Sequence, residues 1–302
     1  MIKRVTRKAL NVEKYNYCIE HSLQSNIFGF SWYLDIVCDN WDVFVLNDYE
    51  AVMPVPWRKK FFIKYGYPPL WIIQLGIYSL EIEDENEFLI ELFSEFKYIE
   101  TRTNASNAFT MFQPFQKQRQ LQVLEMPTTD YKTVFTGYRK DRKKDLKKAQ
   151  KNDLHEKWND NPNSLINLHK ANVGKRAKDF SEQEYEKLEE LIKVCVLKKV
   201  GEILSIYDKD SKLVGSGFFL KHKDRTTILV SSTDFKNRKN GANTFLIDRA
   251  IYKYQARFNK FDFGGSSMRS IAKYFLSFGA SSENYMQLNY NNLPSFLKLL
   301  KK

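Results

Sequence analysis

Short β-rich segments near the start of the chain predict strands. Residues 42–47 (DVFVLN) and 50–55 (EAVMPV) favour extended structure, and Asn47-Asp48 begins the short turn between them. The two segments therefore predict a β-hairpin. In residues 83–96 the apolar side chains recur at helical spacing and acidic residues crowd the first turn, which predicts a helix.

Longer helical patterns follow in the middle of the chain. After a short strand expected at Leu121–Leu124, residues 131–151 predict a single helix. Residues 164–173 predict a second helix. The capping-box spacing from Ser181 to Glu184 opens a third helix, which continues to about residue 199.

From Gly201 onward the pattern changes to strands that alternate with helices. The strands are expected at 202–207, 213–221, 226–233, 260–263 and 285–290, and the helices at 244–258 and 267–278. This order predicts a mixed α/β fold of the α+β type, with mostly antiparallel sheets flanked by helices.

The charge is divided unequally along the chain. The 302 residues carry a formal net charge of +12. Residues 1–130 contain 13 Lys and Arg against 17 Asp and Glu, a net charge of −4, so residues 131–302 carry +16. This asymmetry predicts an anionic partner for the second half. Nucleic acid, a phosphorylated cofactor and an anionic membrane surface all qualify.

Other features of the composition restrict the class of protein. No apolar run reaches the roughly 18 to 20 residues that span a bilayer, and no apolar segment follows the basic N-terminus as in a signal peptide. The three cysteines have no CxxC spacing, and the four histidines form no HxH or HxxxH pair. We therefore expect a cytoplasmic protein without a disulfide framework or a metal site.

Three short motifs resemble those of one protein family. Residues 142–149 (RKKDLKKA), with Asn152 near the following turn, resemble the basic helix of the FemAB-like proteins, which are tandem-GNAT aminoacyl transferases. Residues 261–265 (FDFGG) resemble their Y-D-F-G-G strand end. Residues 275–279 (FLSFG) resemble the aromatic segment that follows it.

The resemblance covers residues 131–290 and implies two tandem GNAT-like modules. It places a first, degenerate module at 1–130 and a second at 131–302, with inserted helices at about 155–200. It also implies transfer of an acyl or aminoacyl group from acyl-CoA or aminoacyl-tRNA to an amine. Neither donor would be a permanently bound cofactor.

The loop before residue 244 departs from the GNAT pattern. In GNAT enzymes a [QR]-x-x-G-x-[GA] loop offers backbone N–H groups at a helix N-terminus to the CoA pyrophosphate. Here Asn243 occupies the last small position, which leaves both donors open. The candidate donor-binding residues are Arg238, Lys239, Gly241 and Ala242.

Asp262 is the candidate catalytic residue. It lies between Phe261 and Phe263 at a strand end beside Gly264-Gly265, and ligands collect at strand ends in open α/β sheets. It would orient or deprotonate the amine, and the alternative is an Asp that caps the following helix. No Ser-His-Asp or Cys-His arrangement stands out, which fits direct transfer within a ternary complex.

Basic and aromatic residues are the candidate substrate contacts. Arg142 interrupts the apolar stripe of its helix, so it needs an anionic partner. That partner is either a substrate or cofactor group or an acid of the same chain. The other candidates are Lys143 on the same helix, Trp57, Arg58 and Tyr65 in an aromatic-basic segment that is expected to be a loop, and Lys175 and Arg176 between two helices. Packing or solvation is the alternative for each.

Together these features predict an N-acyltransferase or aminoacyltransferase of the GNAT/FemAB-like type. Its acceptor would be the amine of a small molecule or a cell-envelope precursor, with tRNA and an anionic membrane surface as further partners. One alternative is a plain CoA-dependent N-acetyltransferase. The other is a non-catalytic binding module for an anionic ligand such as tRNA or a glycan, which the altered loop at Asn243 favours.

Overall fold

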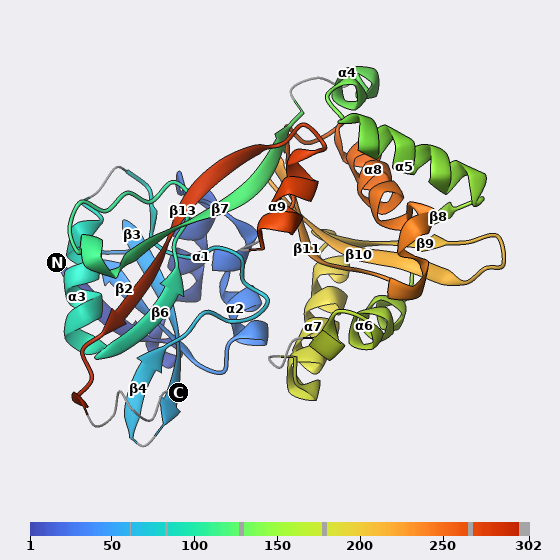
Figure 1. Cartoon of the computed structure of the whole chain (residues 1–302). Coiled ribbons are helices and arrows are strands. Elements are labelled where there is room, and N and C mark those ends of the chain that lie inside the picture. The colour runs from blue at the N-terminus through green and yellow to red at the C-terminus, as the bar shows by residue number, and fades with distance from the viewer. Residues whose placement is uncertain (61, 82–83, 127–129, 177–179, 265–267, 296–302) are drawn as a thin grey trace. The chain divides into compact units, whose positions relative to one another are not determined.

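The computed structural model in Figure 1 describes residues 1–60, 62–81, 84–126, 130–176, 180–264 and 268–295. The chain divides into two compact units. Unit 1 consists of Met1–Arg119 with Asn284–Lys302, and unit 2 of Gln120–Glu283. These units begin and end at other residues than the modules expected at 1–130 and 131–302, and the module assignment stays a prediction.

Unit 1 is built on a sheet with the strand order β1-β2-β3-β4-β6-β13, and β5 pairs with β3. Its strands are β1 (Ile2–Thr6), β2 (Trp41–Leu46), β3 (Ala51–Lys60), β4 (Ile63–Gly66), β5 (Tyr78–Ser79), β6 (Tyr98–Arg102) and β13 (Ser281–Asn291). The antiparallel pairing of β2 with β3 confirms the predicted hairpin. The C-terminal strand β13 pairs antiparallel with β6.

Helices cover both faces of the sheet in unit 1. They are α1 (Val12–His21), α2 (Ser31–Val37) and α3 (Asn86–Glu95), and α3 confirms the helix predicted at 83–96. Phe88 and Leu92 of α3 pack in one core cluster with Phe44, Met53 and Leu288 of the strands. Alternate residues of β2 are buried on the other face, so the sheet is covered on both sides (Figure 1).

Unit 2 has the strand order β7-β12-β11-β10-β9-β8. Its strands are β7 (Gln116–Glu125), β8 (His155–Trp158), β9 (Gly201–Tyr207), β10 (Leu213–His222), β11 (Arg225–Thr233) and β12 (Lys260–Asp262). The three successive strands predicted after Gly201 are confirmed as an antiparallel meander. β12 lies parallel to β11 because α8 connects the two strands across one face of the sheet.

Helices also cover both faces of the sheet in unit 2. Its helices are α4 (Tyr131–Thr136), α5 (Lys140–Lys151), α6 (Pro162–Ala171), α7 (Glu182–Leu197), α8 (Ala242–Tyr254) and α9 (Arg269–Leu276). Figure 1 shows α5 and α8 on one face and α6 and α7 on the other. The Ser181 hydroxyl accepts a hydrogen bond from the backbone N–H of Glu184, as the capping-box spacing predicted.

The single helix expected over residues 131–151 is wrong, because the chain breaks between α4 and α5. Gly137 ends α4, and Arg139 is extended, with φ −64° and ψ 151°. The backbone N–H of Arg139 donates to the carbonyl oxygen of Ser277 instead of continuing the helix. Tyr138 is buried there against the ring of Phe278. Tertiary contacts therefore override the helical pattern of the sequence.

Candidate active site

Strands β11 and β12 run side by side for only three residue pairs and then separate. Their parallel ladder ends at Thr227 and Asp262, whereas β11 continues to Thr233. Over the rest of its length β11 is hydrogen-bonded to β10. Within the described residues no strand pairs with the other edge of 228–233. This divergence, which we call the β11–β12 fork, leaves the two strands paired at the start of β11 and apart toward its C-terminal end.

A β-bulge lies on β11 immediately after the fork opens. Phe219 of β10 pairs with Ile228, whereas Phe218 pairs with Val230, so Leu229 is the extra residue. A bulge bends its strand and increases the local twist, which turns β11 away from β12. The free edge of 228–233 is about 20 Å long at ~3.3 Å per residue. Its unpaired backbone groups are able to hydrogen-bond an extended ligand.

Asp262 stands at the base of the fork, and its side chain takes part in a small cluster of charges. Its residue surface is 2% exposed. One carboxylate oxygen accepts a hydrogen bond of 2.8 Å from the backbone N–H of Gly264, and the other lies 3.4 Å from a guanidinium nitrogen of Arg225. Arg225 in turn donates to both carboxylate oxygens of Glu283, at 2.9 and 2.8 Å. Arg225 is therefore shared between two acids.

The surroundings of Asp262 make it a weaker acid than an ordinary aspartate. Burial raises the pKa of Asp262 from 3.8 to about 6, and the nearby Glu283 acts in the same direction. The charge of Arg225 and the N–H of Gly264 oppose the shift but do not cancel it. A carboxylate with this pKa is mostly ionised at neutral pH and is a better proton acceptor than an exposed aspartate.

Asp262 does not cap the following helix, which was the alternative to a catalytic role. Helix α9 begins at Arg269, and its N-cap is Met268, without a side-chain hydrogen bond to the first turn. Asp262 instead closes a turn on Gly264, whose φ is +76°. The second glycine of the motif, Gly265, lies outside the described residues.

The predicted donor loop lies at the N-terminus of α8. Gly241 precedes the helix with a φ of +91°, and Ala242 is its first, buried residue. Gly241 also packs closely against α5. A Cβ atom added to Gly241 would lie only 2.3 Å from the carbonyl oxygen of Asp145. Lys239 is exposed in the short helix η5 (Phe235–Asn240), and the side chain of Arg238 lies outside the described part of the structure.

Arg142 has partners within its own chain. Its guanidinium contacts Asp145 at 3.0 Å and Asp141 at 3.1 Å, and it donates to the hydroxyl of Thr244 at 2.9 Å. It also lies 4.4 Å from the centre of the Tyr274 ring. The internal ion pair, which the sequence left open beside a ligand contact, is therefore present. It joins α5 to the first turn of α8.

The other basic candidates of unit 2 lie in two different places. Lys143 donates to the carbonyl oxygen of Thr136 at 3.0 Å, so it bridges α5 to the end of α4. Lys175 and Arg176 form the short helix η4 (Gly174–Arg176). The guanidinium of Arg176 lies 4.2 Å from the ring centre of Phe235, at the start of η5. The fold thus brings Arg176 beside the predicted donor loop.

The remaining candidates belong to unit 1. Trp57 and Arg58 are on β3 and Tyr65 is on β4, so the expected loop is a β-hairpin. Arg58 pairs with Asp39 and stacks 4.0 Å from the ring centre of Tyr67. Tyr65 packs near Tyr98, with 6.2 Å between ring centres. These contacts occur within unit 1 and do not by themselves define a ligand site.

The sequence did not single out Arg225 and Glu283. Arg225 starts β11 and Glu283 lies near the start of β13, 58 residues later. Neither residue belongs to a motif of the family resemblance. The only signal was the buried acid itself, because a buried carboxylate needs a cationic or hydrogen-bonding partner. The identity of that partner depends on strand pairing.

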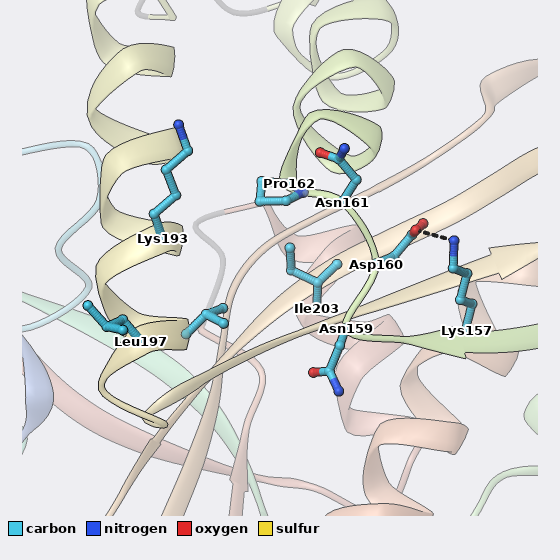
Figure 2. A pocket seen from close by; sticks show the side chains of 9 residues that line it. Lys157, Asn159, Asp160, Asn161, Pro162, Lys193, Leu197 and Ile203 are labelled. Atoms are coloured by element: carbon cyan, nitrogen blue, oxygen red, sulfur yellow. Dashed lines mark ion pairs between the residues drawn. The ribbon is translucent and has the colours of Figure 1, made fainter.

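Unit 2 also contains an open pocket that none of the predicted site residues lines (Figure 2). Its volume is about 680 Å³, and Ile203, Val196 and Leu197 contribute apolar surface. At its rim Lys157 pairs with Asp160 at 2.7 Å, as the dashed line in Figure 2 shows. No residue of the β11–β12 fork named above lines this pocket.

The described residues lack two further features, a cluster of metal ligands and a membrane-spanning helix. Within them, no group of three or more His, Cys, Asp and Glu side chains is arranged to hold a metal ion. No described helix combines the length and apolar character that crossing a membrane requires.

The architecture is that of tandem GNAT proteins. The chain is similar to FemX, with a TM-score of 0.69 and 8% identity over 99% of this chain and 100% of that chain. L-PGS from Bacillus licheniformis superposes with a TM-score of 0.57 and 11% identity, covering 95% and 93% of the two chains.

A tandem GNAT protein from the clavulanic acid biosynthesis pathway gives a TM-score of 0.54 and 7% identity, over 98% of this chain and 100% of that chain. No family model and no curated protein matches the sequence. The similarity at these identities establishes the fold. It confirms the predicted fold class and the resemblance to FemAB-like and GNAT proteins at that level.

Proposed function

We propose that the protein is an N-acyltransferase or aminoacyltransferase whose reaction takes place at the β11–β12 fork. The proposal rests on two observations. Beyond Thr227 the bulged strand β11 pairs with β10 on one edge and, among the described strands, with none on the other. The buried acid Asp262 lies where the two strands separate. The unpaired edge offers backbone N–H groups to the donor, and the acid offers a proton acceptor beside it.

The chemistry at the fork would be direct transfer. The acceptor amine attacks the carbonyl carbon of the donor, a C–N bond forms, and the C–S bond of a thioester or the C–O bond of an ester breaks. Asp262 takes the proton that the amine loses, the departing sulfur or oxygen takes up a proton in turn, and a backbone N–H of β11 stabilises the negative charge that develops on the carbonyl oxygen. Arg225 is a positioning residue, because it holds the Asp262 carboxylate and is itself held by Glu283.

The donor would be acyl-CoA or aminoacyl-tRNA, with its phosphates near the N-terminus of α8. Gly241, Ala242 and Lys239 lie at that helix end, and Arg176 packs beside it. We leave Arg142 out of the donor contacts, because its guanidinium is occupied by Asp141, Asp145 and Thr244. The acceptor class, a small-molecule or cell-envelope precursor amine, rests on the family resemblance alone.

The experiment that tests the proposal begins with the donor. Acetyl-CoA, longer acyl-CoAs and aminoacyl-tRNAs are screened for an increase in melting temperature, since a ligand that binds only the folded protein stabilises it. Turnover with the donor so found is then measured on a panel of amines. Asp262→Asn should lower kcat by about 100-fold or more, the usual contribution of a general base.

A matched control separates catalysis from folding. Asp248 is another buried carboxylate of unit 2, and its partners are Arg249 and the hydroxyl of Tyr131. Asp248→Asn should leave kcat within about threefold, once the folded fraction of each variant is checked by circular dichroism. An Asp262→Asn variant that is folded and fully active removes Asp262 from the mechanism. Donor binding without transfer to any amine supports the binding-module alternative.

A further inference from the structure

The hairpin of β3 and β4 ends in an uncovered aromatic side chain. The two strands pair antiparallel from Trp57 opposite Gly66 to Lys60 opposite Ile63. Phe62 lies in the tight turn beyond the last pair, with a φ of +67°. Phe62 is 93% exposed, so the folded protein leaves this large apolar side chain in water.

The two strands of this hairpin carry basic residues, and the surrounding stretch of sequence contains no acidic residue. Residues 51–80 contain four basic residues and no Asp or Glu, although residues 1–130 as a whole carry a net charge of −4. The basic residues are Arg58, Lys59, Lys60 and Lys64. The positive charge of this part of the chain is therefore concentrated on one hairpin, where Arg58 and Lys64 form ion pairs with Asp39 and Asp42 of unit 1.

The placement of two of these lysines is unfavourable for the isolated protein. Lys59 and Lys64 are directly opposite each other across the two strands, and like charges in that position destabilise a hairpin. The positive charge of Lys64 is offset by Asp42, 3.3 Å away, and by the ring of Trp57, over which its ammonium group lies. The ammonium of Lys59 lies 5.6 Å from the ring centre of Phe62, so it points along the hairpin toward the tip.

We propose that the tip of this hairpin, formed by Phe62 with Lys59 and Lys60, docks on an anionic phospholipid membrane. The aromatic ring would enter the interface between headgroups and acyl chains. The ammonium groups would stay level with the lipid phosphates. This inference concerns where the protein binds, and it does not depend on the proposed transfer reaction.

The order of groups along the hairpin favours a membrane over RNA. Phe62 lies in the turn beyond the last strand pair, and Lys59 and Lys60 lie behind it on β3. An aromatic group below a layer of cations matches the depth profile of a lipid interface. A single-stranded RNA site instead needs aromatic and basic groups side by side along a groove.

Binding to vesicles tests the proposal. Large vesicles of phosphatidylcholine alone, and of phosphatidylcholine with phosphatidylglycerol at 3:1, are sedimented with the full chain at low salt. We expect binding to the anionic vesicles only. Lys59→Gln with Lys60→Gln should weaken it by about 25-fold, since each lysine near an anionic surface is worth about fivefold. Phe62→Ser should weaken it by about tenfold or more.

Matched variants control for general loss of charge or apolar surface. Leu23 is 66% exposed in the same unit and Lys117 is exposed as well, so Leu23→Ser and Lys117→Gln should bind as the unaltered protein does. A fluorescent label reports whether the tip enters the membrane. The native cysteines are buried, so Phe62→Cys offers a site for an environment-sensitive fluorophore. Its emission should shift to the blue on anionic vesicles.

Three results would overturn the proposal. The first is equal binding to neutral and anionic vesicles. The second is unchanged binding of the Phe62→Ser and the Lys59→Gln, Lys60→Gln variants. The third is binding of a labelled single-stranded RNA, measured by fluorescence anisotropy, that is lost in the same variants, together with no binding to vesicles. That outcome would assign the hairpin to RNA.

Discussion

The acid at the fork shows what burial does to a single residue. The pKa of Asp262 is raised from 3.8 to about 6, so the folded protein binds this proton more tightly than the unfolded chain does. Rising pH between about 4 and 6 therefore lowers the free energy of unfolding, by up to about 3 kcal/mol in total. Above that window the loss is complete.

Asp262→Asn removes this titration, so we expect the variant to gain stability relative to the unaltered protein between about pH 4 and 6. The difference should level off above about pH 7. Urea unfolding at several pH values across the window measures it. A difference in free energy that stays constant with pH would show that the carboxylate is not held in the buried, proton-binding state described above.

For single residues, the sequence predicts the position of Asp262 but not the partners of Arg142. The alternation of Phe261, Asp262 and Phe263 was enough to place a polar residue at a strand end, because strand residues alternate between faces. It did not show whether Arg142 would meet a ligand or an internal acid. Asp145, three residues on, was a visible partner, but Thr244 is brought to Arg142 only by the packing of α5 on α8.

Among the elements, the contact between α5 and α8 depends on a single glycine. Gly241 has a left-handed φ of +91°, and an added Cβ would lie 2.3 Å from the backbone oxygen of Asp145. Gly241→Ala should therefore cost about 2 kcal/mol or more, from backbone strain together with displacement of α5. Urea unfolding measures the change, and acyl donor binding should weaken in parallel if the helix end moves.

Gly137 is the matched control for this substitution. It has an ordinary φ of −67°, and the nearest atom to its added Cβ is 3.3 Å away. Gly137→Ala should change the free energy of unfolding by about 0.5 kcal/mol or less. Equal effects of the two substitutions would contradict the tight approach of α5 to α8.

The elements that the sequence predicted are those with a strong local pattern. The meander after Gly201 and the helix capped by Ser181 have clear periodicity and start signals, so they were found. Helix α1 and strand β4 were not. Helix α1 buries only Tyr15, Cys18 and Ile19, and β4 has four residues, so neither has a long enough periodic pattern. The bulge at Leu229 has no local signature, because it is defined by the register against β10.

At the scale of the whole molecule, chain order and compact units do not coincide. Unit 1 has a core cluster that includes Leu288, although this residue lies near the C-terminus and follows all of unit 2 in the sequence. Unit 2 has its own cluster around Leu246, Phe219 and Phe261. Sequence periodicity could predict that residues 285–290 form a strand, but not that the strand pairs with β6, because pairing between distant segments leaves no local pattern.

This division predicts where a C-terminal substitution acts. Leu288 is fully buried against the strands and α3 of unit 1, so Leu288→Ala should destabilise that unit by about 2 to 5 kcal/mol. Hydrogen exchange should then show lost protection in residues 1–119 and unchanged protection in residues 120–283. The exposed neighbour Asn289 serves as control, and Asn289→Ala should leave both patterns as they are. Lost protection confined to unit 2 would show that the C-terminal strand stabilises the unit that precedes it in the chain.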